Sequence, residues 1–167
     1  MKNLWAPWRM TYIEGDDASM VRDPSCLFCR LPKESADRDN LILLRRSDVF
    51  VIMNRYPYSN GHLMVVPYAH EKDLSLLQPA VHQALFATAT EMTKLLAKTV
   101  NAEGFNVGLN LGRCAGAGIA DHLHVHVVPR WSGDTNFMPV LAEAKVISEH
   151  LSATYDKLQS CLKSESP

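Results

Sequence analysis

Three short apolar segments in the first half of the chain have the pattern of β-strands. They are residues 41–46 (LILLRR), 49–54 (VFVIMN) and 62–66 (HLMVV). Runs of this length that are rich in branched and aromatic side chains are typical of strands. Only Ser47 and Asp48 separate the first two segments, which predicts a β-hairpin. Pro57, Asn60 and Gly61 predict a loop before the third strand.

Two segments in the second half alternate between apolar and other residues. In GFNVGLNLG, every second position is Phe105, Val107, Leu109 or Leu111, which predicts a strand with one buried face. Residues 122–128 alternate in the same way and predict a fifth strand.

Two other segments have helical periodicity. After Pro79, apolar residues recur at spacings of three, four and seven, which predicts an amphipathic helix over 80–103 that stops at Gly104. A second stripe predicts a C-terminal helix from about Pro139. The stripes consist of Val81, Leu85, Met92, Leu95, Leu96 and Val100 in the first helix, and of Leu141, Ala144, Ile147, Leu151, Tyr155, Leu158 and Leu162 in the second.

The order of these elements indicates the fold class. Strands, a helix, more strands and a final helix lack regular βαβ alternation, so they predict an α+β fold with a five-stranded, mainly antiparallel sheet and two main helices. A length of 167 residues suits a single domain. We expect residues 1–25 to form an N-terminal arm and residues 26–167 to form the domain.

Charge and composition narrow the function. The chain has 17 basic and 18 acidic residues and a formal net charge of −1, which argues against a nucleic-acid-binding protein but leaves room for a small phosphorylated ligand. There is no signal-peptide pattern and no stretch of about 20 apolar residues. We therefore expect a cytoplasmic protein with no membrane partner.

Three of the seven histidines lie within five residues of one another. On a strand over 122–128, His122, His124 and His126 share one face and stand roughly 6.6 Å apart, while the apolar residues between them share the other. Imidazole titrates near neutrality and can act as nucleophile, base or metal ligand. The residues alone therefore leave two readings, a metal site or acid–base and nucleophilic chemistry on an anion.

The connection before the histidines favours an anion. It contains Gly112, Gly116 and Gly118 within nine residues, and glycines allow backbone N–H groups to turn inward as an anion-binding nest. Together with the histidine face, this loop predicts an anion-binding site.

These motifs resemble the histidine triad (HIT) superfamily of nucleotide hydrolases and transferases. The likeness rests on DHLHVHVVPRW and on the upstream Asn-x-Gly and Ala-Gly residues, and it runs from Cys26 to about Arg130. LWAPWRMTYI at the N-terminus, Arg130-Trp131 and GDTNFM (133–138) resemble the bacterial branch related to diadenosine tetraphosphate phosphorylases. The resemblance also implies a homodimer, for which the helix over 80–103 and the N-terminal arm are the candidate contacts.

The resemblance implies a role for each site residue. His124 would be the nucleophile that attacks the α-phosphate, His126 would contact phosphate oxygens, and His122 would orient the other imidazoles. The implied phosphate ligands are Asn110 and the amides around Gly116–Gly118, the ribose ligand is Asn54, and His62 gives structural support. Trp131 either stacks on a base or packs at the strand end.

A Cys-x-x-Cys pair raises the question of a metal. Cys26 and Cys29 are half a zinc site, a redox pair or a packing feature when taken alone. Several HIT relatives bind a structural zinc, and the resemblance implies His70 and His122 as the remaining ligands. In that case His122 is not a free catalytic group. We expect no organic cofactor.

The resemblance leaves several functions open. The leading expectation is phosphorolysis of dinucleoside polyphosphates through a nucleotidyl-histidine, with inorganic phosphate as acceptor and ADP and ATP as products from diadenosine tetraphosphate. The alternatives are a HIT hydrolase that releases AMP, a nucleotide-binding regulatory module with negligible turnover, and a metalloenzyme that uses all three histidines.

Overall fold

The computed structural model describes residues 26–135 and 147–165. The predicted N-terminal arm and the start of the C-terminal helix near Pro139 lie outside these residues. So do positions 136–138 of the GDTNFM segment. The prediction that the C-terminal helix already includes Ile147 is wrong, because residues 147–150 are not helical and the helix begins at Leu151.

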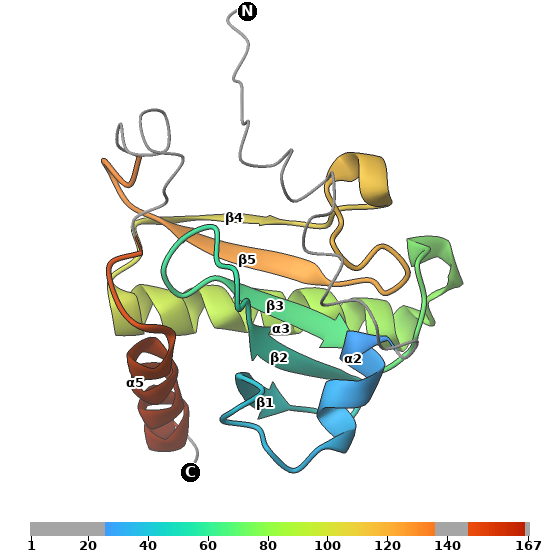
Figure 1. The fold of residues 1–167 in the computed structure, drawn as a ribbon, viewed down its shortest axis with the longest axis horizontal. Coiled ribbons are helices and arrows are strands. Elements are labelled where there is room, and N and C mark those ends of the chain that lie inside the picture. The colour runs from blue at the N-terminus through green and yellow to red at the C-terminus, as the bar shows by residue number, and fades with distance from the viewer. Residues whose placement is uncertain (1–25, 136–146, 166–167) are drawn as a thin grey trace, which may run out of the picture.

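Five strands form one sheet in the order β1-β2-β3-β5-β4, and every neighbouring pair is antiparallel (Figure 1). The strands are β1 (Ile42–Arg45), β2 (Val49–Met53), β3 (Leu63–Pro67), β4 (Gly104–Gly108) and β5 (Val125–Arg130). The predicted hairpin is confirmed, because β1 and β2 pair directly and the Arg46 N–H donates to the Val49 carbonyl at 2.9 Å. The α+β class and the antiparallel sheet are confirmed as well.

Helices lie on both faces of the sheet (Figure 1). The long helix α3 crosses the back, the short helix α2 lies at the front, and α5 packs beside α3. The α-helices are α2 (Leu27–Arg30), α3 (Pro79–Val100) and α5 (Leu151–Glu165), and the 3-10 turns are η1 (Leu31–Lys33), η2 (Leu74–Leu76) and η3 (Arg113–Ala115). Among the described residues, no helix has both the length and the apolarity needed to cross a membrane.

Strand alternation divides the core into two apolar clusters. On the face that α3 covers, Val51, Val65 and Val125 pack with α3 and α5 in the larger cluster. On the opposite face, Ile52 and Met64 belong to a smaller cluster that α2 covers through its Phe28 side chain. Because Met64 pairs with His126 across β3 and β5, the histidine side chains lie on this second face.

Two predictions about the region after α3 are wrong. The helix ends at Val100 rather than at 103, because Asn101 adopts a left-handed conformation (φ 52°), and Gly104 is the first residue of β4. The predicted buried face of the fourth strand is only half buried: Phe105 packs on the core, while Val107 is 46% exposed. The reason is that β4 is an edge strand, so α3 covers it only in part.

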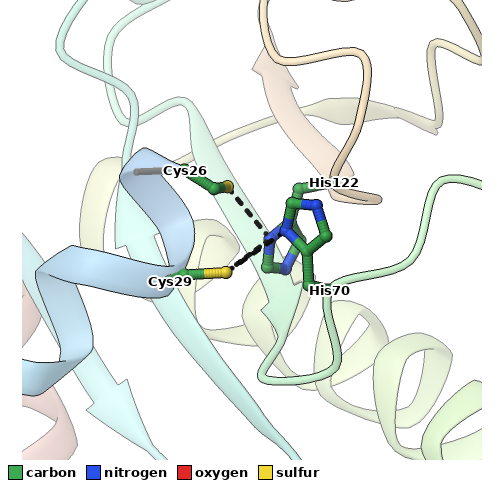
Figure 2. Close-up of side chains that lie close together, drawn as sticks. All are labelled: Cys26, Cys29, His70 and His122. Atoms are coloured by element: carbon green, nitrogen blue, oxygen red, sulfur yellow. Dashed lines mark hydrogen bonds between the residues drawn. The ribbon is translucent and has the colours of Figure 1, made fainter. Parts of the chain in front are cut away.

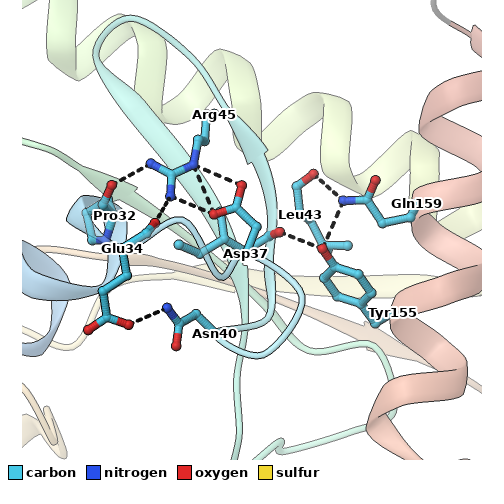
Figure 3. Close-up of polar contacts among 9 residues, drawn as sticks. Pro32, Glu34, Asp37, Asn40, Leu43, Arg45, Tyr155 and Gln159 are labelled. Atoms are coloured by element: carbon cyan, nitrogen blue, oxygen red, sulfur yellow. Dashed lines mark hydrogen bonds and ion pairs between the residues drawn. The ribbon is translucent and has the colours of Figure 1, made fainter.

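Side-chain hydrogen bonds connect the other edge strand of the sheet, β1, to neighbouring segments (Figure 3). The Tyr155 hydroxyl on α5 donates to the Ile42 carbonyl at 2.9 Å, and the Gln159 amide donates to the Leu43 carbonyl at 2.7 Å. Arg45 of β1 donates to the Asp37 carboxylate and to two backbone carbonyls of the 32–34 segment. These contacts hold α5 and the segment that follows α2 against β1.

Candidate active site and metal cluster

The three clustered histidines are buried together in front of the sheet. β5 begins at Val125, so the strand predicted over 122–128 starts later, and only His126 lies within it. The predicted alternation nevertheless holds, since Leu123 packs in the core while His122, His124 and His126 are 1%, 6% and 8% exposed. Burial lowers the pKa of all three imidazoles, which keeps them neutral near pH 7.

A hydrogen bond to the backbone determines which ring nitrogen of His124 can act as a nucleophile. Its Nδ1 lies 2.9 Å from the carbonyl oxygen of His122. A carbonyl can only accept a hydrogen bond, so Nδ1 carries the ring proton and Nε2 keeps its lone pair. The ring is packed against Phe28, with the centroids 5.1 Å apart. The imidazole is therefore neutral, oriented and unprotonated at Nε2.

His126 lies beside His124 and next to Asn110. The two imidazole centroids are 4.8 Å apart in an edge-to-face arrangement. The Nε2 atom of His126 is 3.4 Å from the Asn110 amide nitrogen, and its Nδ1 is 2.9 Å from Nε2 of the buried His62. Burial, with a smaller contribution from His124, lowers the pKa of His126 to about 4. The structure thus brings together three of the predicted phosphate-binding and catalytic residues.

The glycine loop forms a tight turn next to this group. Gly112 and Gly116 have φ angles of 80° and 87°, which favour glycine, and they bracket the turn η3. The Gly116 N–H donates to the Arg113 carbonyl at 2.9 Å, so it is engaged within the turn in this structure, and a phosphate-binding role for Gly116 stays a prediction. The Gly116 carbonyl accepts from the Asn110 amide at 3.4 Å and helps to place that side chain. A phosphate-binding role for Gly112 and Gly118 stays a prediction.

Trp131 lies at the far end of β5. Its indole N–H donates to the Asn101 carbonyl at 2.8 Å and approaches the Val100 carbonyl at 3.3 Å, which caps the C-terminus of α3. The neighbouring Arg130 forms an ion pair with Asp134. Of the two predicted roles for Trp131, this geometry favours packing at the strand end, and base stacking stays a prediction.

Cys26, which immediately precedes α2, and Cys29 within α2 face two histidines (Figure 2). Cys26 Sγ is 3.3 Å from His122 Nδ1, Cys29 Sγ is 3.2 Å from His70 Nδ1, and one ligand atom from each residue lies within 4.8 Å of all the others. Tetrahedral Zn²⁺ with ordinary bond lengths would place sulfur and nitrogen ligands about 3.5 Å apart. Two thiols and two imidazoles at this spacing fit a zinc ion.

His122 has both ring nitrogens engaged. Nε2 donates to the Pro67 carbonyl at 2.8 Å, which leaves the Nδ1 lone pair directed at the cysteine sulfurs. His122 is therefore arranged as a metal ligand and not as a free acid or base. Its contact with His124 is made by the backbone carbonyl.

A family model confirms the resemblance. The model described as the HIT domain matches residues 35–133 of the chain. The chain belongs to the HIT family. An "AP-4-A phosphorylase" of Mycobacterium tuberculosis is 40% identical to this HIT protein over an alignment of 160 positions that covers 92% of this chain and 80% of the relative. The "Adenylylsulfatase HINT3" of Arabidopsis thaliana is 26% identical over 121 residues, 72% of this chain and 60% of the relative.

Solved structures agree on the fold. A "ZN-bound histidine triad family protein" from Mycobacterium smegmatis superimposes with a TM-score of 0.68 at 23% identity, over 84% of this chain and 94% of the other. This likeness establishes the fold of the HIT domain. The 40% identical relative is an enzyme, which confirms that this HIT protein is one.

Two residues of the site were not predicted from the sequence. Phe28 contacts both His122 and His124, and the Tyr58 ring lies 5.6 Å from that of His126. The position of Phe28 next to Cys29 was a usable signal, because an element that brings the two cysteines to the histidines also brings one of the two residues between them, whereas the other, Leu27, is 41% exposed. Tyr58 lies in an irregular loop, and sequence periodicity does not predict in which direction a loop side chain points.

Proposed function

We propose that this HIT enzyme transfers a nucleotidyl group from a dinucleoside polyphosphate to inorganic phosphate, converting diadenosine tetraphosphate and phosphate into ADP and ATP. The observation that carries the proposal is the 2.9 Å hydrogen bond from His124 Nδ1 to the His122 carbonyl. It leaves Nε2 as a neutral nucleophile beside donors suited to phosphate oxygens. The 40% identity to an AP-4-A phosphorylase supports the choice of substrate.

The reaction proceeds in two displacements at the α-phosphorus. The Nε2 lone pair of His124 forms an N–P bond as the bond from phosphorus to the bridging oxygen breaks, and ATP leaves with that electron pair. The ring becomes a cation, which the His122 carbonyl stabilises through Nδ1–H. A phosphate oxygen then attacks phosphorus, the N–P bond breaks, and ADP leaves as Nε2 regains its lone pair.

The neighbouring polar groups bind the phosphoryl oxygens. His126 Nε2 and the Asn110 amide are 3.4 Å apart, so one oxygen at about 2.9 Å from each nitrogen could accept from both. Donors placed in this way stabilise the charge that develops on the equatorial oxygens. Asn54 lies beside His62, and we propose that it binds the ribose.

Product analysis tests the choice of acceptor. Purified enzyme is incubated with diadenosine tetraphosphate and ³²P-labelled inorganic phosphate, and the nucleotides are separated. We expect ADP and ATP in equal amounts, with the label in ADP alone. Release of AMP at the same rate with and without phosphate would contradict phosphorolysis and favour a hydrolase, the activity class of the 26% identical adenylylsulfatase.

We also propose that Cys26, Cys29, His70 and His122 hold a structural zinc ion. The ion would link α2 to the segment that precedes β5 and so restrain the backbone of His122. The burial of Cys29 and the proximity of Cys26 raise the pKa of the Cys29 thiol, and a bound cation offsets both effects. Elemental analysis of protein prepared without chelators should find close to one zinc per chain.

The oligomer is a further part of the proposal. We propose a homodimer, as the family resemblance implies, and the exposed Val107 on the edge strand β4 is consistent with a covered surface in the assembly. Light scattering after size-exclusion chromatography should give twice the chain mass of 18.7 kDa.

A further inference from the structure

A fourth histidine lies behind the three clustered ones. His62 immediately precedes β3 and is fully buried. Its Nε2 is 2.9 Å from Nδ1 of His126, and the two rings are 5.1 Å apart at an angle of 49°. In a hydrogen bond between two neutral imidazoles one nitrogen must carry the proton, so the direction of this bond determines the tautomer of His126.

The surroundings of His62 determine that direction. The Tyr58 backbone N–H lies 3.1 Å from His62 Nδ1 and can only donate. The Asn54 side-chain nitrogen lies 3.3 Å from the same atom. The orientation of Asn54 is itself fixed, because its Oδ1 accepts the Tyr56 backbone N–H at 2.9 Å. Two donors therefore converge on Nδ1 of His62, which must be unprotonated.

The protonation state of His62 Nδ1 determines the tautomers of both His62 and His126. With Nδ1 of His62 as acceptor, the proton of neutral His62 is on Nε2 and is donated to Nδ1 of His126. Neutral His126 then carries its own proton on Nε2, the atom that faces Asn110. A His126 N–H and an Asn110 amide N–H thus point at the same space, and only an acceptor such as a phosphate oxygen satisfies both.

We propose that His62 is a positioning residue that holds His126 neutral and protonated at Nε2, so that His126 presents a hydrogen-bond donor to the phosphoryl group. The inference rests on the proposed function for the identity of that group. It also gives Asn54 and the Tyr58 amide a role in fixing a tautomer, in addition to any contact with the ribose.

This arrangement defines what His126 can do. Loss of the Nε2 proton would leave His126 as an imidazolate unless His62 donated its own Nε2 proton to Nδ1 of His126. His62 would then be an imidazolate in turn, because the Tyr58 backbone amide does not give up its proton. His126 therefore acts as a donor to an oxygen and not as a general acid. A leaving group that is stable as an anion, such as a nucleoside polyphosphate, suits this site.

The first experiment uses the unaltered full chain. Long-range ¹H–¹⁵N NMR of ¹⁵N-labelled protein distinguishes protonated from unprotonated ring nitrogens, and the His126 signals are assigned by their loss in His126→Gln. We expect His126 to be unprotonated at Nδ1 and protonated at Nε2 between pH 7 and pH 5.5, and His62 to show the same tautomer. A proton on Nδ1 of either ring would overturn the proposal.

The second experiment compares variants of His62. His62→Phe removes the donor, and we expect kcat for phosphorolysis to fall about 10- to 100-fold, as for loss of a hydrogen bond that supports a charged group. His62→Gln retains an N–H donor and should recover most of kcat, and His82→Gln on the exposed surface of α3 is the matched control. Equal losses in the Phe and Gln variants would contradict a positioning role.

The pH profile separates positioning from simple packing. Among residues 26–135 and 147–165, the titratable groups that contact His126 are His62, His124 and Tyr58. Without the donor from His62, Nδ1 of His126 can take up a proton, so the acid limb of the kcat profile should move to higher pH in His62→Phe but not in His62→Gln. An unmoved limb in His62→Phe would contradict the proposal.

The outcomes are distinguishable from failure of the proposed function. If the protein shows no phosphorolysis but NMR finds both tautomers as expected, the proposed function fails and the tautomer assignment stands. Titration with inorganic phosphate should then still perturb the His126 Nε2–H signal. If phosphorolysis occurs but the tautomers differ, only the role of His62 is overturned.

Discussion

The backbone carbonyl of His122 accepts the Nδ1–H of His124 at 2.9 Å, while the His122 ring faces the sulfur of Cys26 at 3.3 Å. One residue therefore joins the candidate metal cluster to the candidate nucleophile. The connection runs through the backbone, so anything that displaces the His122 ring also displaces the acceptor that orients His124.

Replacement of the nucleophile should abolish turnover. His124→Gly removes the only atom that forms the N–P bond in the proposed mechanism, so kcat should fall by about 10⁴-fold or more. The fold should persist, because His124 lies on the face of the sheet with the smaller apolar cluster. The larger cluster between the sheet and α3 is untouched. Steady-state kinetics and circular dichroism check both points, with His82→Gln as control; a variant that retains a tenth of the activity excludes His124 as nucleophile.

Loss of a cluster thiol should lower both metal content and stability. Cys26→Ser is expected to reduce bound zinc to well below one per chain and to destabilise the fold by at least about 2 kcal/mol, or roughly 4–8 °C in Tm. Elemental analysis and thermal unfolding measure the two effects. Cys114→Ser is the matched control, because Cys114 is exposed. The metal assignment is wrong if the two variants behave alike.

The buried His126 should make stability depend on pH. Its pKa is about 4 in the folded protein against 6.5 for the free side chain, so at pH values between these the unfolded state binds a proton that the folded state does not. Stability therefore rises with pH through this window and falls as the pH is lowered, by about 1.4 kcal/mol per unit for this residue.

Urea unfolding at pH 7, 6 and 5 measures this dependence. His126→Gln cannot take up the proton in either state, so its free energy of unfolding should fall less steeply with decreasing pH than that of the natural protein. Parallel pH profiles for the two proteins are incompatible with a neutral, buried His126.

The contact between α5 and β1 should contribute to stability but not to catalysis. Tyr155→Phe removes the hydroxyl that donates to the Ile42 carbonyl and leaves that carbonyl without this partner. The expected loss is about 1–2 kcal/mol. Ser160→Ala, on the exposed side of the same helix, serves as control. Denaturant melts and kcat together check the prediction, which fails if kcat falls more than the folded fraction explains.

Much of the fold could be predicted from the sequence because the local patterns are strong. The alternation of Leu123, Val125 and Val127 correctly indicated a buried face, and the stripe from Leu85 to Leu96 correctly indicated a helix. The boundaries were less accurate. Asn101, and not Gly104, ends α3, because asparagine also tolerates the left-handed conformation. The exposure of Val107 depends on strand order, which periodicity along one strand does not contain.

The residues of the site that belong to sequence motifs could be predicted. The four metal-cluster residues and the phosphate-binding residues His126 and Asn110 were named from the family resemblance, and the structure brings the members of each set together. The contacts of Phe28, Tyr58 and His62 were not predicted in detail, because they depend on how a loop and a short helix fold back over the sheet. The engagement of the Gly116 amide within its own turn likewise depends on local geometry.

The stereochemistry of transfer tests the central claim most directly. The substrate is diadenosine tetraphosphate with a chiral α-phosphorothioate of known configuration, and the configuration of the resulting ADPαS is determined. Attack by His124 followed by attack of phosphate inverts the phosphorus twice, so the account predicts net retention. Net inversion would mean that phosphate attacks the substrate directly, and it would contradict a nucleotidyl-histidine intermediate.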